Sequence, residues 1–234
     1  MISHYADNEG VRIHYMDASP HSSLVPLLIC PGLSETAEEY ADLMRYLLPR
    51  RCVVLSFRGR GRSDTPDSGY GLQEHVSDID SVVRATGLIR FHLYAHSRGV
   101  SYALGYARSH PSAVASLILQ EYPPEHKRMA EGWAERYNRE YLVPFARQRN
   151  IRPEAVRGIA RDSEQEDLVF PFPRKLVVVR GMLDDSLLDD DAVAAYRRMN
   201  PAATELPFHR SGHAVRSTEQ ESLFRAIATT LDQQ

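Results

Sequence analysis

The sequence predicts an α/β protein with a mostly parallel, doubly wound sheet of about eight strands. Short, continuously apolar segments recur along the 234 residues, which is typical of strands buried on both faces. Segments with helical periodicity separate these strands, and such alternation builds a parallel sheet with helices on both faces. With 43% apolar and 25% charged residues, a chain of this length can form one large domain with a sizeable core.

The first elements are an expected β-hairpin and a buried strand. Residues 4–7 and 11–16 flank a turn in which Gly10 can adopt the positive φ that a tight hairpin needs. Residues 24–30 form a continuous apolar run, and Pro31-Gly32 ends it. We therefore expect an N-terminal antiparallel hairpin that leads into the parallel part of the sheet.

The following elements alternate between helix and strand. Up to residue 121, we expect helices at 35–48, 73–86 and 98–108 and strands at 52–57, 89–95 and 114–121. In the C-terminal part, we expect strands at 175–180 and 204–208 and helices at 192–199 and 218–231.

Residues 123–173 interrupt this alternation and are predicted to be an inserted helical cap within a single domain spanning residues 1–234. This segment is rich in arginine, glutamate and aromatic residues and contains no clear strand. Apolar side chains recur there every four residues, which places them on one helical face. They are Met129, Trp133, Tyr137, Tyr141 and Phe145.

The segment around Ser97 is the strongest functional signal. An apolar strand ends at Ala95 and is followed by His96, Ser97, Arg98 and Gly99, where a helical pattern begins. A serine hydroxyl becomes a useful nucleophile only when it is exposed, close to a base and beside donors for the developing oxyanion. A tight strand-to-helix turn with small residues two before and two after the serine meets the first requirement. Ser97 is therefore the candidate nucleophile.

Two later loops carry a candidate acid and base. In a doubly wound sheet, functional groups lie on loops at the carboxyl ends of strands. The strand at 175–180 ends in Gly181-x-x-Asp184, and the loop after the last strand contains Gly212-His213. The chain order is therefore serine, aspartate, histidine.

These motifs, in this order, resemble those of the α/β-hydrolase-fold serine hydrolases over nearly the whole chain. The resemblance implies the α/β-hydrolase fold and a catalytic triad. In that triad, Ser97 is the nucleophile, His213 is the general base and then the acid, and Asp184 orients the imidazole. Ala95 stands where the family usually has glycine.

Alternatives to these assignments remain open. Asp185 is adjacent to Asp184, and Glu121 closes an earlier strand at a position where some relatives keep their acid. His209 competes with His213, although its place at a strand end favours packing or solvent exposure. We expect His96 to be a structural residue of the turn.

The resemblance also implies an oxyanion hole made by two backbone N–H groups. One belongs to Arg98, and the other to the loop Pro31–Ser34, with Leu33 as the expected donor. Relatives usually have His-Gly where this chain has Pro31-Gly32. The loop at 58–63 matches the family's Arg-Gly-x-Gly-x-Ser segment and is expected to be structural.

The side chains of Arg98 and of the cap allow more than one role. The Arg98 side chain could hold the cap or a substrate carboxylate, but a helix-surface arginine paired with an acid is favoured. In the implied fold the cap covers the serine, so Trp133 and Tyr137 are candidate substrate contacts, although their stripe is expected to be chiefly cap core.

The expected function is hydrolysis of a small ester, thioester or lactone through an acyl-enzyme on Ser97. C–C bond hydrolysis or lyase-type chemistry on the same triad, or ligand binding without catalysis, are the alternatives. We expect neither a cofactor nor a metal. A net charge of −3 offers no case for nucleic acid binding, and no apolar run is long enough to cross a membrane.

The N-terminus does not resemble a secretory signal. Cys30 and Cys52 indicate two small buried thiols rather than a disulfide framework. We therefore expect a cytoplasmic protein with a small-molecule substrate and no membrane partner; its oligomeric state is left open.

Overall fold

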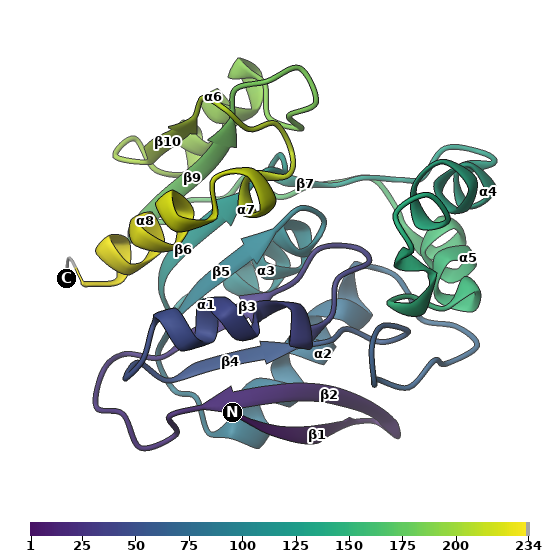
Figure 1. Cartoon of the computed structure of the whole chain (residues 1–234), viewed down its shortest axis with the longest axis horizontal. Helices are drawn as coiled ribbons and strands as arrows, with labels where there is room; N and C mark the ends of the chain where they lie inside the picture. The colour runs from purple at the N-terminus through teal and green to yellow at the C-terminus, as the bar shows by residue number, and fades with distance from the viewer. Residues whose placement is uncertain (233–234) are drawn as a thin grey trace.

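The computed structural model describes residues 1–232 and has the mostly parallel, doubly wound α/β architecture that the sequence predicts. Its main sheet has eight strands in the order β1-β2-β4-β3-β5-β6-β9-β10 (Figure 1). The first two strands pair antiparallel to each other and β2 pairs antiparallel to β4, whereas the remaining neighbours are parallel. The strands are β1 (Ile2–Asn8), β2 (Val11–Ala18), β3 (Leu27–Cys30), β4 (Cys52–Leu55), β5 (Phe91–His96), β6 (Val114–Gln120), β9 (Lys175–Gly181) and β10 (Thr204–Phe208).

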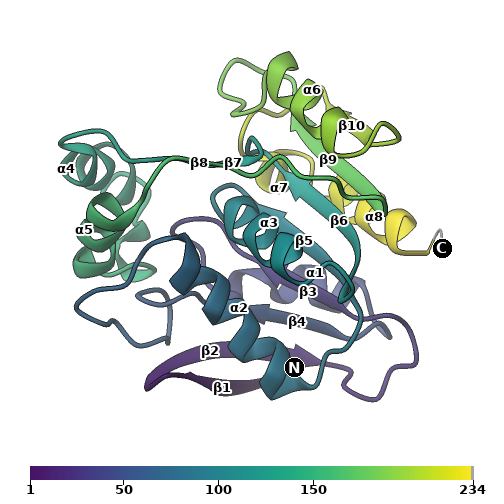
Figure 2. The ribbon, with the colours of Figure 1, turned by 180° about the vertical axis from the view of Figure 1, so that it is seen from behind.

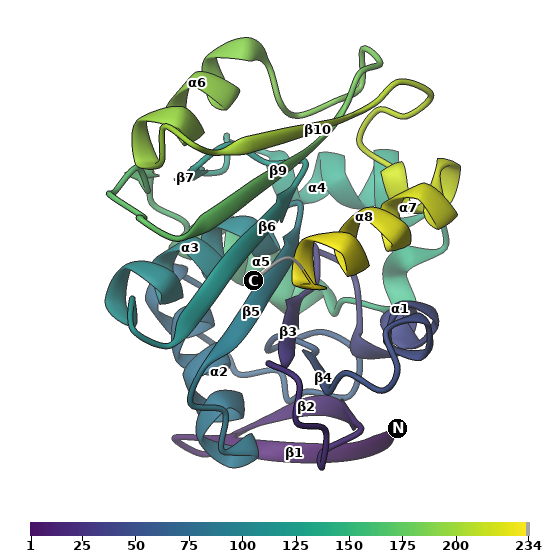
Figure 3. The same ribbon diagram turned by 90° about the vertical axis from the view of Figure 1, so that its left-hand side faces the viewer.

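Helices cover both faces of this sheet, as expected for a doubly wound fold (Figure 3). The helices of the main body are α1 (Ala41–Tyr46), which follows the 3-10 turn η1 (Ala37–Tyr40), α2 (Leu72–Thr86), α3 (Gly99–Ser109), α6 (Asp190–Met199), α7 (Val215–Thr218) and α8 (Gln220–Asp232). Two predicted helices are divided: residues 35–48 give η1 and α1, and residues 218–231 give the end of α7 followed by α8.

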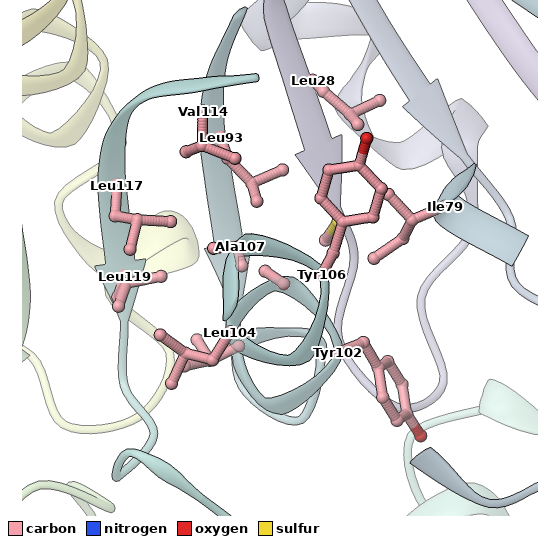
Figure 4. Packing of buried hydrophobic residues seen from close by; sticks show 14 of the residues in the cluster. Leu28, Ile79, Leu93, Tyr102, Leu104, Tyr106, Ala107, Val114, Leu117 and Leu119 are labelled. Carbon is pink, nitrogen blue, oxygen red and sulfur yellow. The ribbon is translucent and has the colours of Figure 1, made fainter. Parts of the chain in front are cut away.

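Two hydrophobic layers hold the helices to the sheet. One layer packs α2, α3 and α6 against one face, and the other packs α1 and α8 against the opposite face. Figure 4 shows the first layer, where Leu104 and Ala107 of α3 lie beside Leu93 of β5 and Leu117 and Leu119 of β6. This packing holds the start of α3, and therefore the turn at Ser97, rigidly against the sheet.

Residues 123–173 leave the main body after β6 and return before β9 (Figure 2). A two-stranded ribbon, absent from the sequence prediction, forms the connection: β7 (Glu125–His126) pairs antiparallel with β8 (Glu166–Asp167). The helical turns beyond this ribbon are α4 (Trp133–Tyr137), the wide turn η2 (Asn138–Leu142), the 3-10 turn η3 (Arg147–Arg149) and α5 (Pro153–Asp162). Each ribbon strand has two residues, too few to produce a recognisable alternation pattern.

Among residues 1–232, no helix is both long enough and apolar enough to cross a membrane. Both cysteines are buried and free.

Candidate active site

Ser97 lies on a strained turn between β5 and α3. Its φ is +50°, a left-handed conformation that a non-glycine residue adopts only when the surrounding structure enforces it. The N–H of Ser97 donates to the Gln120 carbonyl of β6 at 2.8 Å, which anchors the turn to the sheet. A side chain at Gly99 would place its Cβ 2.3 Å from the Pro31 carbonyl oxygen. Glycine is therefore required at this close approach, as the sequence pattern indicated.

His213 lies in the loop between β10 and α7, and the carboxylate next to it belongs to Glu121. The distance from His213 Nδ1 to Glu121 Oε2 is 3.5 Å. Catalytic hydrogen bonds are often this long without substrate. The φ of Glu121 is +57°, immediately after the end of β6. Two non-glycine residues with left-handed backbone conformations, Ser97 and Glu121, thus follow neighbouring parallel strands.

The carboxylate of Glu121 is fully buried, and the groups that contact it are hydrogen-bond donors. Gly181 N at 2.7 Å and the Ser186 hydroxyl at 2.8 Å bind Oε1, and Leu187 N binds Oε2 at 3.0 Å. Burial opposes ionisation, but His213 and these donors outweigh it and hold the pKa of Glu121 below its usual value. Glu121 is therefore ionised and oriented at neutral pH.

The structure does not bring Asp184 to His213, which corrects the position expected for the acid. Asp184 is exposed in the turn after β9, and within residues 1–232 no hydrogen bond or ion pair joins it to His213. Asp185 is also exposed, and its carboxylate packs against Gly212, where an added Cβ would lie 1.6 Å from Oδ1. His209, the competitor of His213, is exposed.

The two backbone N–H groups expected to form an oxyanion hole lie at the same cavity as Ser97. Leu33 and Arg98 both line this cavity. Among the described residues, neither N–H donates to a protein acceptor, so both are available to a ligand. The N–H of Gly32, by contrast, is occupied by Glu35 Oε2 at 2.7 Å.

His96 and Glu35 form a second histidine–carboxylate pair beside the site. His96 Nδ1 lies 3.0 Å from Glu35 Oε2, which also accepts from the Tyr40 hydroxyl at 2.6 Å. Burial opposes the charged form of His96, but Glu35 outweighs it and raises the pKa of His96. The His96 ring stacks on His213 with centroids 5.1 Å apart. Sequence reasoning assigned His96 a structural role and did not identify Glu35 as its partner.

A cavity of about 400 Å³ opens above Ser97 and His213. The cap supplies much of its wall, including Trp133 and Tyr137, whose rings stack 4.9 Å apart, and Tyr141, which stacks on Tyr137 at 5.2 Å. The Tyr137 hydroxyl also lies 3.0 Å from Ser34 Oγ and so links the cap to the Leu33 loop. The aromatic stripe therefore serves both as cap packing and as cavity lining.

The Arg98 side chain is not on the surface, and among residues 1–232 it is not paired with an acid. It is 2% exposed, and its guanidinium binds neutral groups of α3, of the segment after β6, of β7 and of the chain after α5. The interpretation favoured from sequence was wrong, because burial of α3 directs this side chain toward the base of the cap. Within residues 1–232, no group of three or more His, Cys, Asp or Glu side chains could hold a metal ion.

Residues 25–157 match the family model of the alpha/beta hydrolase fold. A non-heme chloroperoxidase from Streptomyces lividans is 28% identical over 120 residues, which cover 50% of this chain and 43% of that protein. An N-formylmaleamate deformylase from Pseudomonas putida is 30% identical over 118 residues, covering 49% of this chain and 42% of that protein. The chain thus spans less than half the length of these two curated relatives.

Solved structures agree over almost the entire chain. An esterase from a Rhodococcus species superposes with a TM-score of 0.84 at 17% identity, covering 100% of this chain and 99% of that one. An enol-lactonase from Burkholderia xenovorans superposes with a TM-score of 0.81 at 16% identity, covering 97% and 99%. At these identities the likeness establishes the fold alone.

Proposed function

Because the chain belongs to the alpha/beta hydrolase fold family, we propose that it is a serine hydrolase that cleaves a small carboxylic ester, thioester or lactone. The observation that carries this proposal is the arrangement of side chains at the carboxyl ends of the parallel strands. There, Ser97 on its strained turn shares a cavity with His213, and His213 has the buried carboxylate of Glu121 behind it. A nucleophile, a base and an orienting acid are the groups that acyl transfer requires.

Glu121 is the acid in this proposal. Its Oε2 lies 3.5 Å from His213 Nδ1, and in the proposed reaction this contact closes to a hydrogen bond in which Nδ1 donates. Nε2 of His213 is then left to take the Ser97 proton. Ser97 Oγ then attacks the substrate carbonyl, and the N–H groups of Leu33 and Arg98 stabilise the tetrahedral oxyanion.

His213 next donates its proton to the leaving group, whose bond to the acyl carbon breaks. A water molecule, deprotonated by His213, attacks the acyl-enzyme. Collapse of the second tetrahedral intermediate releases the acid and returns the proton to Ser97.

The cavity supports a small substrate. Its volume of about 400 Å³ lies near the lower end of the usual range for ligand sites, roughly 300–1,000 Å³. The aromatic wall formed by Trp133, Tyr137 and Tyr141 favours an apolar or planar group next to the scissile bond. This size and lining are better suited to a short acyl chain than to a lipid.

The experiment that tests the proposal compares the wild type with Ser97→Ala on p-nitrophenyl acetate, a short thioester and a small lactone. We expect the wild type to turn over at least one of them and Ser97→Ala to lose about 10⁶-fold in kcat while keeping its fold. Unchanged turnover by Ser97→Ala would contradict the nucleophile assignment. Wild-type protein that is inert to all three substrates would favour C–C bond cleavage or ligand binding instead.

A further inference from the structure

We propose that two buried arginines, Arg60 and Arg98, hold the two halves of the oxyanion hole and place uncompensated positive charge behind it. This inference rests on the proposed function and adds positioning residues to it. Arg60 is 1% exposed and Arg98 is 2% exposed. Within residues 1–232, neither guanidinium forms an ion pair with a carboxylate. Arginine stays protonated in proteins, so both side chains carry full charges.

Arg60 holds the Leu33 half. Its Nε donates to the Leu33 carbonyl oxygen at 3.0 Å. Its Nη1 donates to the Arg58 carbonyl at 2.6 Å and to His75 Nε2 at 2.8 Å. His75 Nδ1 faces the Gly71 carbonyl at 2.7 Å and therefore donates to it, which leaves Nε2 free to accept. The peptide that carries one oxyanion donor is thus fastened to a buried, charged side chain.

Arg98 holds the other half through a closed ring of hydrogen bonds. Its Nη2 donates to His126 Nε2 at 3.1 Å, so the proton of neutral His126 is on Nδ1. His126 Nδ1 donates to Ser101 Oγ at 3.0 Å, and the Ser101 hydroxyl donates to the Arg98 backbone carbonyl at 2.9 Å. The ring begins and ends on Arg98, the residue that supplies the second N–H of the proposed oxyanion hole.

The same guanidinium also ties the cap to this turn. Arg98 Nη2 lies 2.7 Å from Ser163 Oγ, just after α5, and 3.2 Å from the Lys127 carbonyl, just after β7. Both crossings between the main body and the cap therefore meet at one side chain. Displacement of the cap would disturb the Arg98 segment directly.

The side chains that the two guanidinium groups bind are neutral, so they do not cancel the charge. Burial, followed by the charges of nearby arginines, lowers the pKa of His75 well below its usual value. Burial and the charge of Arg98 lower the pKa of His126 to about 3. Tyr102, whose ring stacks on His75 at 4.0 Å, accepts from Arg98 Nε at 3.2 Å and joins the two halves.

Asp78 is the carboxylate that acts on Arg60, but it is already bound by other groups. Its oxygens accept from the Arg58 guanidinium, at distances down to 2.7 Å, and from Asn8 Nδ2 at 2.8 Å. With the Arg58–Asp78 pair neutral overall, Arg60 and Arg98 leave an excess of positive charge beneath the hole. In a buried site such charge stabilises a developing oxyanion more than it does a neutral ester.

The test uses Arg60→Met and Arg98→Met in the full chain, with Arg50→Met as the matched control. Arg50 is also buried, but it lies before β4, at the amino end of the parallel strands. It binds the Val25 and Leu231 carbonyls and, unlike Arg60 and Arg98, forms an ion pair with a carboxylate, that of Asp232 at 2.8 Å. The measurements are kcat and KM for a p-nitrophenyl ester and the affinity for an arylboronic acid, which binds serine as a tetrahedral anion. Binding of the corresponding neutral alcohol gives the ground-state reference.

For Arg60→Met and Arg98→Met, we expect kcat to fall about 10- to 100-fold, less than the 10²–10³ caused by loss of an oxyanion donor. Boronate affinity should fall in parallel, while KM and alcohol binding change by less than about threefold. Arg50→Met should lower stability without these losses. Should Arg98→Met not fold, Ser101→Ala breaks the ring without removing charge and should lower kcat about 3- to 10-fold.

The inference is overturned if both arginine variants, or Ser101→Ala in place of Arg98→Met, keep the kcat and boronate affinity of Arg50→Met. This result differs from failure of the proposed function. If the proposed function is wrong, the wild type itself neither hydrolyses esters nor binds the boronate.

Discussion

Replacing Glu121 by glutamine should nearly abolish activity, whereas replacing Asp184 by asparagine should not. All four groups around the Glu121 carboxylate are donors: Gly181 N, the Ser186 hydroxyl, Leu187 N and His213 Nδ1. An amide substitutes two N–H donors for one acceptor oxygen, so it must point them at groups that also donate.

The size of the effect follows from which side the amide nitrogen takes. On the Oε2 side it faces Leu187 N and His213 Nδ1, leaves the Leu187 N–H unpaired and favours the wrong tautomer of His213. An unpaired buried donor costs about 1–3 kcal/mol of stability, and the wrong tautomer costs about 10⁴ in kcat. On the Oε1 side it opposes Gly181 N, at a similar cost in stability. The Ser186 hydroxyl does not decide between the two orientations, because it can donate to the Leu188 carbonyl at 3.3 Å and accept from the amide. In either orientation the negative charge that stabilises protonated His213 is lost, so kcat falls in both.

The assay is kcat/KM on an aryl ester for Glu121→Gln and Asp184→Asn, together with urea unfolding of both. Because Asp184 is exposed, its variant should keep activity within about twofold and stability within about 0.5 kcal/mol. A loss of activity in Asp184→Asn alongside full activity in Glu121→Gln would refute the reasoning and restore Asp184 as the acid.

Three further outcomes are expected. Gly99→Ala should lower urea-unfolding stability by at least about 1–3 kcal/mol, since its Cβ would lie 2.3 Å from the Pro31 carbonyl oxygen; wild-type stability would contradict the close packing. Trp133→Ala should raise KM for aryl esters about tenfold with a smaller change in kcat, and an unchanged KM would remove Trp133 from the substrate wall. His126, with its pKa lowered to about 3, binds a proton only when the chain unfolds, so acid destabilises the fold. His126 alone lowers the free energy of unfolding by about 2 kcal/mol at pH 5 relative to pH 8. The urea-unfolding midpoints of wild type and His126→Gln should therefore converge as pH falls. Midpoints that change in parallel with pH would refute this.

The parts of the fold that depend on local pattern were predictable from the sequence. The buried strand β4 is apolar throughout, and the turn at Ser97 combines a strand end, small residues and a helix start. These features follow from burial and backbone geometry, which a sequence displays directly. The two-residue strands β7 and β8 were missed because so short a ribbon leaves no periodicity.

The choice of acid was predicted from family spacing and is where the structure differs. Asp184 has the expected distance in sequence from Gly181, but the turn after β9 leaves it exposed. Glu121 was weighed as an alternative. The available signal was a charged residue directly after the buried strand at 114–120, because a buried charge needs several hydrogen-bond donors. The donors themselves come from distant loops, which the sequence does not place beside Glu121.

The pairing of Glu35 with His96 and the contacts of Arg60 had no sequence signal, and contact of the Arg98 side chain with the cap was only the less favoured of the sequence interpretations. Each depends on segments far apart in the chain, such as Arg98 with Ser163. Local patterns report the periodicity of one segment and contain no information about which distant polar groups meet in the core. A buried arginine without an acid partner therefore looks like a surface arginine until the tertiary contacts are known.

Labelling with a fluorophosphonate probe, followed by peptide mapping, tests the central claim most directly. Wild type and His213→Ala are treated side by side, with circular dichroism to establish that both are folded. The account predicts that the probe reacts at Ser97 in the wild type and that the reaction disappears in His213→Ala, because the serine needs its base. Folded wild-type protein that is not labelled, or that is labelled at another residue, would contradict it.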